Sequence, residues 1–352
     1  MSKKVLVAMS GGVDSTIAAY LLKKAGYDVK GIHFRFWRWR GKDEDYQKEV
    51  DRLNLMSSHL GIEMVTVDAQ NTFRERVISQ MFEMLEKGLT PNPCIHCNPM
   101  MKFDQLLKYA EIENADFVAT GHYVISQLND EGNVSLIQAV DKSKDQSYFL
   151  CQLDQHILKR TIFPLGKTIK EENKQLAVEL GLSFEEKPES QDLCFLTNQS
   201  YSDFINSELP EIMKPGKIKD VSGNVIGTHH GLPNYTIGQR KGIEISASKP
   251  YYVVEKDIKN NTLIVGNAAD LKFNYMIVSG MNWISGKPIE KLSCNVKIRY
   301  RSPDYDCSLT KISQTEYRVE FSRNLRDITP GQYAVFYRGE EMLGGGMIVS
   351  AD

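Results

Sequence analysis

Hydrophobic and polar positions along residues 1–199 follow two alternating patterns. Short apolar runs rich in β-branched residues are separated by longer segments whose apolar residues recur at helical spacing. Strands that alternate with helices predict a parallel sheet covered on both faces, with ligands at the carboxyl ends of its strands. The expected strands are residues 5–8, 29–34, 64–67 and 117–120, and the expected helices are residues 16–24, 46–59, 73–86, 102–111 and 170–180.

The pattern changes after residue 199. A predicted helix over residues 200–209 leads into short β-branched runs that glycines interrupt, with turns expected at residues 222–224 and 259–261. From residue 271 onward the regular spacing of short strands predicts a small β-barrel. The expected barrel strands are residues 276–283, 292–300, 307–312, 317–321, 332–338 and 341–349.

The first strand-to-helix junction carries the sequence Ser10-Gly11-Gly12-Val13-Asp14-Ser15. Adjacent glycines let backbone N–H groups turn inward around an anion, and the helix start adds its positive end and nearby hydroxyls. No lysine follows the glycines, so the loop is not the Walker type. A plain glycine turn with Asp14 or Ser15 capping the helix is the simpler alternative. The position of all six residues at this junction favours a phosphate-binding loop.

The composition is that of an ordinary globular protein, and the net charge bears on which partners the chain could bind. With 352 residues, 41% apolar and 25% charged, two or three domains are expected. Its 43 basic and 45 acidic residues give a net charge of −2, so any RNA contact must come from local patches. The sequence has neither a membrane-length apolar run nor a signal-peptide pattern, and we expect a cytoplasmic protein with no membrane partner.

One segment mixes cations with aromatic residues. It comprises Arg35, Phe36, Trp37, Arg38, Trp39, Arg40 and Lys42. Such a mixture is typical of surfaces that stack single-stranded RNA. Arginines that extend over a half-buried aromatic cluster explain the same pattern equally well. The sequence leaves both interpretations open.

The cysteines do not suggest a disulfide framework in such a chain. They stand at positions 94, 97, 151, 194, 294 and 307. We interpret Cys151, Cys294 and Cys307 as small buried hydrophobic residues. Prolines at positions 91 and 93 predict an extended loop over residues 90–98, which would hold Cys97 at a cleft.

Cys194 lies in a second loop, with polar residues before it and apolar residues after it. It could therefore lie on a mobile segment with one buried end. A thiol in a polar loop near positive charge has a lowered pKa, and its thiolate is a nucleophile and a sulfur carrier. Cys97 and Cys194 are the two candidates for that chemistry.

Several motifs resemble those of a known family. SGGVDS is similar to the PP-loop of the N-type ATP pyrophosphatase superfamily. The further motifs are TPNPCIHCN with Lys102 and Phe103, ATGHY at 119–123, SKDQSYFL at 143–150, SQDLCF at 190–195, GQRKG at 238–242, KIRYR at 297–301 and LGGG at 343–346. In this order, and across nearly the whole chain, they resemble the bacterial tRNA-specific 2-thiouridylases.

The resemblance implies a fold and a set of site residues. The fold is α/β: a PP-loop ATP-pyrophosphatase domain (1–199) with a parallel sheet, a small central domain (200–270) and a C-terminal β-barrel (271–352). Cys97 would be the catalytic nucleophile and Cys194 the residue that carries the persulfide. The implied ATP-binding residues are Ala8, Met9, Ser10, Gly11, Gly12, Val13, Asp14, Ser15, Phe34 and Gly121, and the implied tRNA-binding residues are Asn92, Pro93, Cys94, Lys144, Asp145, Gln146, Arg299 and Tyr300.

The resemblance also implies the reaction and its partners. The enzyme, a tRNA-uridine 2-sulfurtransferase, would use ATP and Mg²⁺ to adenylate the wobble uridine, position 34, in the anticodon stem-loop of tRNA. A cysteine persulfide, charged by a cysteine desulfurase or a sulfur-relay protein, would then convert it to 2-thiouridine. Asp14 could help to hold Mg²⁺, and Cys97 and Cys194 could end the cycle as a disulfide.

Two positions and one segment depart from the family pattern. Phe34 stands where many members have methionine, and Cys94 stands where many have aspartate. Cys94, Cys97 and Cys194 could therefore ligate an iron–sulfur cluster, an alternative that we rank below the persulfide. Residues 35–58 also differ from the acidic, alanine-rich segment expected there.

Basic residues in the GQRKG and KIRYR motifs could bind tRNA phosphates. Arg299 and Arg301, two residues apart on a predicted barrel strand, are expected to share one face. Arg240 and Lys241 lie in a predicted turn and could equally be solvated. The rival functions are another PP-loop enzyme, such as a GMP-synthetase-like, argininosuccinate-synthetase-like or tRNA-lysidine-synthetase-like protein, and a non-catalytic tRNA-binding module.

Overall fold

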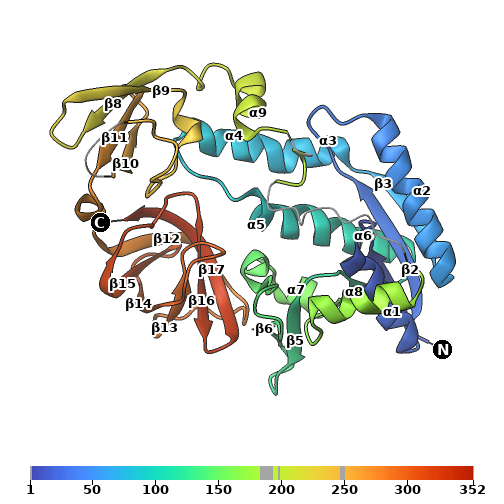
Figure 1. Ribbon diagram of the computed structural model, residues 1–352. Coiled ribbons are helices and arrows are strands. Elements are labelled where there is room, and N and C mark those ends of the chain that lie inside the picture. Colours follow the sequence, from blue (N-terminus) through green and yellow to red (C-terminus); the bar gives the residue numbers. More distant parts are fainter. Residues whose placement is uncertain (1, 183–192, 197–198, 246–249, 352) are drawn as a thin grey trace.

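A five-stranded parallel sheet organises the amino-terminal part of the chain (Figure 1). The computed structural model describes residues 2–182, 193–196, 199–245 and 250–351. The strand order is β3-β2-β1-β4-β7. The strands are β1 Lys4–Ala8, β2 Asp28–Arg35, β3 Glu63–Asp68, β4 Phe117–Ala119 and β7 Thr161–Ile162.

Helices cover both faces of this sheet, as the sequence predicts. Alternate side chains of a strand point to opposite faces. Val5 and Val7 accordingly pack in one cluster with Ala19 of α1 (Val13–Lys24), whereas Leu6 packs in another with Leu106. The helices are α2 Asp43–Leu60, α3 Gln70–Phe73, α4 Ser79–Glu86, α6 Asp104–Ile112, α7 Gln155–Leu158 and α8 Lys170–Glu179, with α3 and α4 joined by the π-helical turn η1 Arg74–Ile78.

The strand order reverses at β1. β2 pairs with β1 on one side and β4 pairs with it on the other, both in parallel. In open parallel sheets, ligands bind beside such a reversal, at the carboxyl ends of the strands. The glycine-rich loop follows β1 at this place.

The prediction of an extended loop over residues 90–98 is wrong from Pro93 onward. Pro93 opens the helix α5 (Pro93–Cys97), which continues through the π-helical turn η2 (Asn98–Phe103) into α6. A proline fits the first helical position, because its missing N–H has no partner there and its φ already suits a helix. Cys97 is therefore held on a helix.

A four-stranded sheet, ordered β10-β11-β8-β9, forms the central part of the chain. It follows the predicted helix, which the structure places at α9 (Tyr201–Glu208). Both predicted turns are present, one between β8 and β9 and the other between β10 and β11. The strands are β8 Gly216–Asp220, β9 Val225–His229, β10 Tyr252–Asp257 and β11 Thr262–Gly266.

Six antiparallel strands close into a barrel at the carboxyl end, because β12 pairs with both β15 and β17. The α/β fold class with a C-terminal barrel is thereby confirmed. The strands are β12 Phe273–Trp283, β13 Lys291–Lys297, β14 Tyr305–Lys311, β15 Glu316–Leu325, β16 Tyr333–Arg338 and β17 Glu341–Ala351.

A hairpin of the first domain extends the barrel sheet, which the sequence did not predict. β5 (Val124–Leu128) and β6 (Val134–Gln138) follow β4, and β6 pairs with the barrel strand β17 (Figure 1). Leu136 and Val335 belong to one buried cluster, so this junction is apolar. No helix among the described residues is long and apolar enough to span a bilayer.

Candidate active site

The loop between β1 and α1 has the geometry of an anion cradle. Gly11 has φ +73°, a conformation that favours glycine, and Gly12 precedes the first turn of α1. The Ser15 hydroxyl accepts a hydrogen bond from the Ser10 N–H and donates one to the Gly12 carbonyl, both at 3.1 Å. Ser10 and Gly12 are exposed. The loop is thus braced from inside while its outer edge is open to a ligand.

Gly121 packs against this loop from the end of β4. A Cβ at this position would lie 2.8 Å from the backbone nitrogen of Ser15 and 2.9 Å from the carbonyl carbon of Asp14. Glycine is therefore required for the turn after β4 to reach the first turn of α1. The next residue, His122, is 9% exposed and bonds through Nδ1 to the Thr120 hydroxyl at 2.7 Å.

Asp14 is neutralised by a lysine that sequence reasoning missed. Lys170 Nζ donates to both carboxylate oxygens of Asp14 at 2.7 Å, and the Tyr123 hydroxyl donates to one of them at 2.7 Å. Asn173 donates in turn to the Tyr123 hydroxyl. The lysine lies 156 residues from Asp14, at the start of a predicted helix, so no local pattern marks it. The carboxylate is thus engaged by protein donors.

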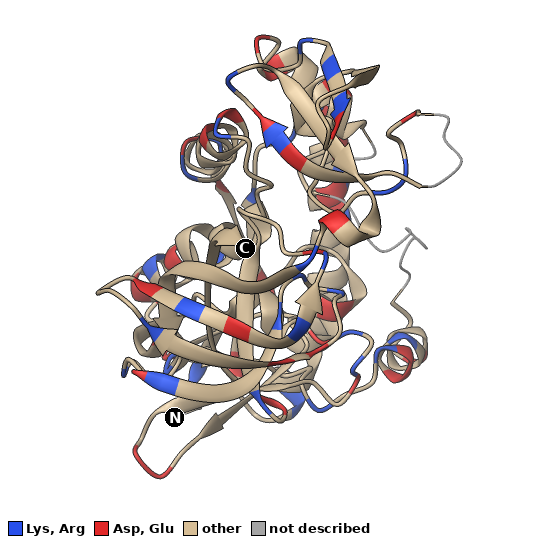
Figure 2. Ribbon diagram, turned by 90° about the vertical axis from the view of Figure 1, so that its left-hand side faces the viewer, with Lys and Arg blue, Asp and Glu red and all other residues tan. Residues whose placement is uncertain are grey.

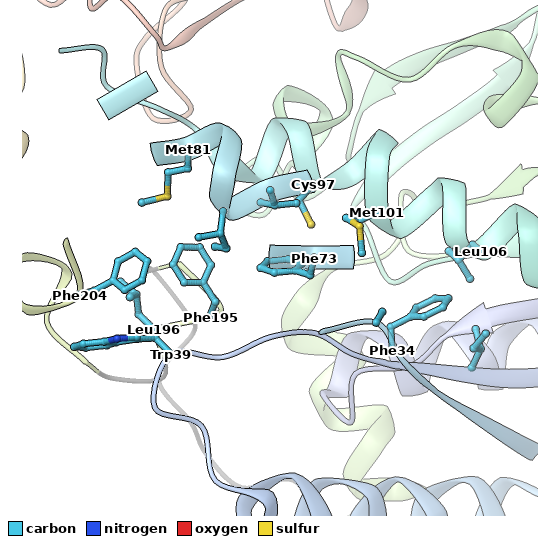
Figure 3. Packing of buried hydrophobic residues seen from close by; sticks show 14 of the residues in the cluster. Phe34, Trp39, Phe73, Met81, Cys97, Met101, Leu106, Phe195, Leu196 and Phe204 are labelled. Atoms are coloured by element: carbon cyan, nitrogen blue, oxygen red, sulfur yellow. The ribbon is translucent and has the colours of Figure 1, made fainter. Parts of the chain in front are cut away.

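Phe34 lies at the carboxyl end of β2 and is 8% exposed. Its ring stacks on Phe36 with centroids 6.0 Å apart and meets Tyr109 edge-on at 5.9 Å. The same buried cluster contains Cys97 and Met101 (Figure 3). One core therefore connects the strand end beside the glycine loop with the catalytic thiol candidate.

The thiol candidates differ in exposure, and their pKa values do not follow the sequence prediction. Cys97 is 7% exposed, Cys94 is half-buried and Cys194 is exposed. Burial raises the pKa of Cys94 to about 11 and that of Cys97 to about 12, so both thiols are protonated at neutral pH. The expected lowered pKa is wrong because desolvation outweighs the nearby positive charge.

Surrounding protein also raises the pKa of the Cys194 thiol, by desolvation, although the positive charges of Lys102 and Arg38 oppose the shift. Its solvent exposure, rather than this shift, governs its access to a sulfur donor. Leu193 to Leu196 are described, whereas the other residues of the SQDLCF motif lie outside the described part of the chain.

Lys102 is the cation that the three thiols share. It lies on η2, is half-buried, and favours the thiolate form of Cys94, Cys97 and Cys194 electrostatically. It also lowers the pKa of His122, which burial already lowers. No carboxylate of the described ranges pairs with Lys102. The sequence places Lys102 in a family motif but does not indicate this role.

Buried aromatic residues anchor the Cys194 loop. Phe195 and Leu196 are 2% and 3% exposed, and the Trp39 N–H donates to the Phe195 carbonyl at 2.9 Å. Trp39 meets Phe204 edge-on at 5.5 Å (Figure 3). The prediction that the Cys194 loop has one buried end is confirmed, and that end is Phe195 and Leu196.

The basic and aromatic segment 35–42 forms part of this core. Arg38 pairs with Glu49 at 2.5 Å, Arg35 pairs with Asp43, and the Arg40 guanidinium lies 4.3 Å from the ring centroid of Trp39. Of the two interpretations, the structure therefore favours arginines over an aromatic cluster. The segment supports the Cys194 loop, and its rings pack against Phe73, Phe195 and Phe204.

The expected tRNA-binding residues lie where the three domains meet, and several hold that junction together. Tyr300 Oη donates to the Asp145 carbonyl at 3.0 Å, and Arg299 donates to the Ile237 carbonyl at 2.8 Å. Asp145 is 6% exposed and accepts from the Ser147 hydroxyl. Gln146 accepts from the Tyr123 N–H.

The sequence predicted that Arg299 and Arg301 share one face of a barrel strand, and this prediction is wrong. β13 ends at Lys297, and both arginines lie in the turn that leads to β14. Arg301 is exposed, as are Arg240 and Lys241 in the turn of the central domain. Basic and acidic residues are mixed over the central sheet and the barrel (Figure 2).

A cavity of about 220 Å³ lies beside the thiol-bearing elements. Pro93 and Leu193, the neighbours of Cys94 and Cys194 in sequence, both line it. The remaining wall comes from α4, from residues 89–91, from Tyr201 of α9, and from residues 233, 234 and 236 of the central domain. Within the described ranges, no three Cys, His, Asp or Glu side chains converge as metal ligands.

The sheet, its glycine loop and the reversal beside β1 define the class of ATP-using PP-loop enzymes. Family models agree with this assignment. A tRNA methyl transferase HUP domain matches residues 3–198, a tRNA methyl transferase PRC-barrel domain matches 202–267, and an aminomethyltransferase beta-barrel domain matches 273–348.

Within this class, the chain belongs to the family of tRNA-specific 2-thiouridylases. It is 40% identical to tRNA-specific 2-thiouridylase MnmA 1 of Thermoanaerobacter pseudethanolicus, over 99% of this chain and 98% of that one. It is 39% identical to MnmA of Natranaerobius thermophilus, over 100% and 98%. The expected enzyme class, a tRNA-uridine 2-sulfurtransferase, is confirmed.

A search of solved structures gives weaker likenesses. U34-tRNA thiolase NcsA from Methanococcus maripaludis, with its [4Fe-4S] cluster, has 24% identity and a TM-score of 0.35. That likeness covers 59% of this chain and 67% of the other.

Proposed function

We propose that this chain replaces the 2-oxygen of the wobble uridine, position 34, of tRNA with sulfur by adenylation followed by persulfide transfer. The observation that carries the proposal is that one cation, Lys102, favours the thiolate of three cysteines in the domain that also holds the phosphate loop. The turn containing Gly121 and His122 links the two regions. Gly121 packs against the loop, and the charge of Lys102 lowers the pKa of His122.

The first step requires an electrophilic base, since the 2-oxygen of uridine is a poor leaving group. Attack of this oxygen on the α-phosphorus of ATP forms an O-adenylated base and releases pyrophosphate. Exposed N–H groups of the glycine loop and the amino end of α1 bind the leaving pyrophosphate, with Ala8 to Ser15, Phe34 and Gly121 as the nucleotide site. Mg²⁺ would supply neutralisation of the phosphate charge, and Asp14, the residue expected to help hold it, is engaged by Lys170 and Tyr123.

The second step transfers sulfur with balanced electrons. The outer sulfur of a Cys194 persulfide attacks C2 of the adenylated base, and AMP leaves with the former 2-oxygen. The Cys97 thiolate then attacks the Cys194 sulfur, the S–S bond breaks, and 2-thiouridine leaves. A thiol reductant resets the resulting Cys97–Cys194 disulfide. Alternatively, Cys97 attacks the persulfide first and frees sulfide beside the base.

The cavity beside Pro93 and Leu193 is our proposed site for the flipped uridine. Its apolar wall and the Tyr201 ring suit a base that has left its stack. Pro93, which lines the cavity, would then meet the base together with its neighbours Asn92 and Cys94, at the start of the helix that carries Cys97. The cavity wall comes from both the first and the central domain.

The tRNA anticodon stem-loop is proposed to lie across the junction of the three domains. Exposed Arg240, Lys241 and Arg301, with half-buried Lys144, would contact phosphates. Asp145, Gln146, Arg299 and Tyr300 would support this surface through the contacts they make inside the protein. We propose residues 1–199, 200–270 and 271–352 as the three domains that meet there.

A cysteine desulfurase or a sulfur-relay protein is the proposed donor, since exposed Cys194 can receive sulfur directly from a partner. The reaction belongs in the cytoplasm, where tRNA is available. Cys94, Cys97 and Cys194 as ligands of an iron–sulfur cluster remain the alternative carrier. Iron and sulfide analysis of protein purified without oxygen distinguishes the two carriers.

The test of the proposal combines purified chain, tRNA, labelled ATP, and a desulfurase with cysteine. Cys97→Ser and Cys194→Ser should each abolish 2-thiouridine, measured by mass analysis of tRNA nucleosides, while tRNA-dependent pyrophosphate release survives in at least one of them. Cys151→Ala, at a buried thiol that the mechanism does not use, is the control. Full thiolation by both serine variants would contradict the proposal.

The same assay separates the rival functions. A PP-loop enzyme of another kind would release pyrophosphate with a different acceptor and without forming 2-thiouridine. A non-catalytic tRNA-binding module would bind tRNA without releasing pyrophosphate.

A further inference from the structure

Cys294 and Cys307 lie opposite each other in the C-terminal barrel. They are directly paired residues of the antiparallel strands β13 and β14, and their sulfur atoms are 3.7 Å apart. Directly opposed residues of such strands have Cα atoms about 4.5–5.5 Å apart. A disulfide spans Cα distances of about 4.4–6.8 Å. The backbone therefore already has the spacing of a cross-strand disulfide. As the sequence predicted, Cys307 is buried in the barrel core, and half-buried Cys294 packs against that core.

The pair has an asymmetry that suits thiol–disulfide exchange. Cys294 is half-buried and reachable from solvent, whereas Cys307 is 7% exposed. The contact with the Cys307 sulfur and the charge of the Arg338 guanidinium both lower the pKa of Cys294. Cys294 is thus the attacking thiol, and Cys307 lies within reach to resolve a mixed disulfide.

The hairpin that carries these thiols connects the three domains. Beyond the cysteine pair, the register continues through Asn295–Asp306 and Val296–Tyr305 to the turn that holds Arg299 and Tyr300. Through that turn the barrel bonds to the Ile237 carbonyl of the central domain and the Asp145 carbonyl of the first. A covalent link at the pair would fix the base of this connecting hairpin.

We propose that Cys294 and Cys307 form a dithiol–disulfide site that a low-molecular-weight disulfide oxidises. The Cys294 thiolate attacks one sulfur of the small disulfide and displaces one thiolate. Cys307 then gives its proton to solvent and attacks the Cys294 sulfur, which displaces the second thiolate. One small disulfide is reduced to two thiols, and one protein disulfide forms. The site is independent of the sulfur transfer proposed above.

The experiment uses the full chain and oxidised glutathione as the probe. After incubation, free thiols are alkylated under denaturing conditions, and trypsin cuts between the two cysteines at Lys297, Arg299 and Arg301. We expect a linked pair of peptides containing Cys294 and Cys307, lighter by two hydrogen atoms than the separate peptides and released by reduction. Hydrogen exchange of the amides in β13 and β14 should slow in the oxidised protein.

Matched variants make the outcome decisive. Cys307→Ala should stop at a glutathione adduct on Cys294, because the resolving thiol is absent, and Cys294→Ala should show neither adduct nor link. Buried Cys151 should stay alkylatable throughout. Finding both thiols fully alkylated after oxidation, or stable adducts on Cys294 in the unsubstituted chain, would overturn the proposal. Because the readout is a peptide mass, failure of the thiolation mechanism would not change it.

Discussion

Burial and charge act in opposite directions on the Cys97 thiol. Removal from water disfavours the thiolate, whereas the Lys102 ammonium favours it, and burial has the larger effect. A thiol held protonated in this way is protected from oxidation at rest. It becomes a nucleophile only where the cation compensates for the lost hydration, so Lys102 is the residue on which sulfur transfer should depend.

Lys102→Met should lower the rate of 2-thiouridine formation by about 100-fold, the scale expected when one stabilising group at a reacting anion is removed. The positive charge of Lys102 lowers the pKa of Cys97, which burial has raised to about 12. Removing that charge should therefore raise the Cys97 pKa further. Alkylation of Cys97, which requires thiolate, should then begin at higher pH in the variant.

Lys108→Met is the matched control, since Lys108 is an exposed lysine of the same helical run. It should keep both the rate and the alkylation profile of the original chain. An unchanged alkylation profile in Lys102→Met would show that the ammonium does not act on Cys97.

At the level of elements, α1 and α8 are joined at the phosphate loop by one ion pair. Lys170 at the amino end of α8 holds Asp14 in the first turn of α1, with the Tyr123 hydroxyl as a third member. A carboxylate in that turn would otherwise repel the phosphates of ATP. The pair lets the helix end act as an anion site despite its acidic residue.

Lys170→Met should weaken ATP binding at least tenfold, because it leaves the Asp14 charge uncompensated beside the phosphates; tenfold corresponds to about 1.4 kcal/mol. Equilibrium binding of labelled ATP measures the effect. Lys174→Met, at an exposed position of the same helix, is the control and should bind ATP normally.

Adding Asp14→Asn to Lys170→Met should restore part of the affinity, since it removes the unpaired charge. If the single and the double variant bind ATP equally, the ion pair does not serve the nucleotide.

Local sequence patterns predicted most elements but not the contacts between distant ones. The strands around β1 and the barrel strands follow from periodicity, which short segments carry by themselves. The pairing of β6 with β17 and of Lys170 with Asp14 depends on residues far apart in sequence, which no local pattern relates. At Pro93 the predicted loop is a helix start, because proline is excluded from a helix interior but favoured in its first turn.

At the scale of the whole molecule, three domains meet at residues expected to bind tRNA. Arg299 and Tyr300 hold the junction, which leaves the exposed cations around it to contact phosphates. The net charge of −2 provides no general attraction for RNA. Affinity should therefore depend on a few identifiable cations, in particular Arg240 and Lys241 of the central domain.

Affinity for tRNA should fall as salt rises, because cations that bind phosphates release the counterions held there. The double variant Arg240→Gln with Lys241→Gln leaves up to two phosphates without a protein cation. The slope of log affinity against log salt should then become shallower by about 1.4–1.8, at roughly 0.7–0.9 for each phosphate that is no longer neutralised. Titration of labelled tRNA at several salt concentrations measures this slope.

Lys287→Gln provides the control, since Lys287 is an exposed lysine that already pairs with Glu131 of the β5–β6 hairpin. It should leave the slope unchanged, which would separate a specific surface from a general effect of net charge. The ATP affinity of the double variant should stay normal, because the glycine loop lies in another domain. An unaltered slope in the double variant would place the tRNA backbone elsewhere and would leave the turn at 238–242 as a solvated loop.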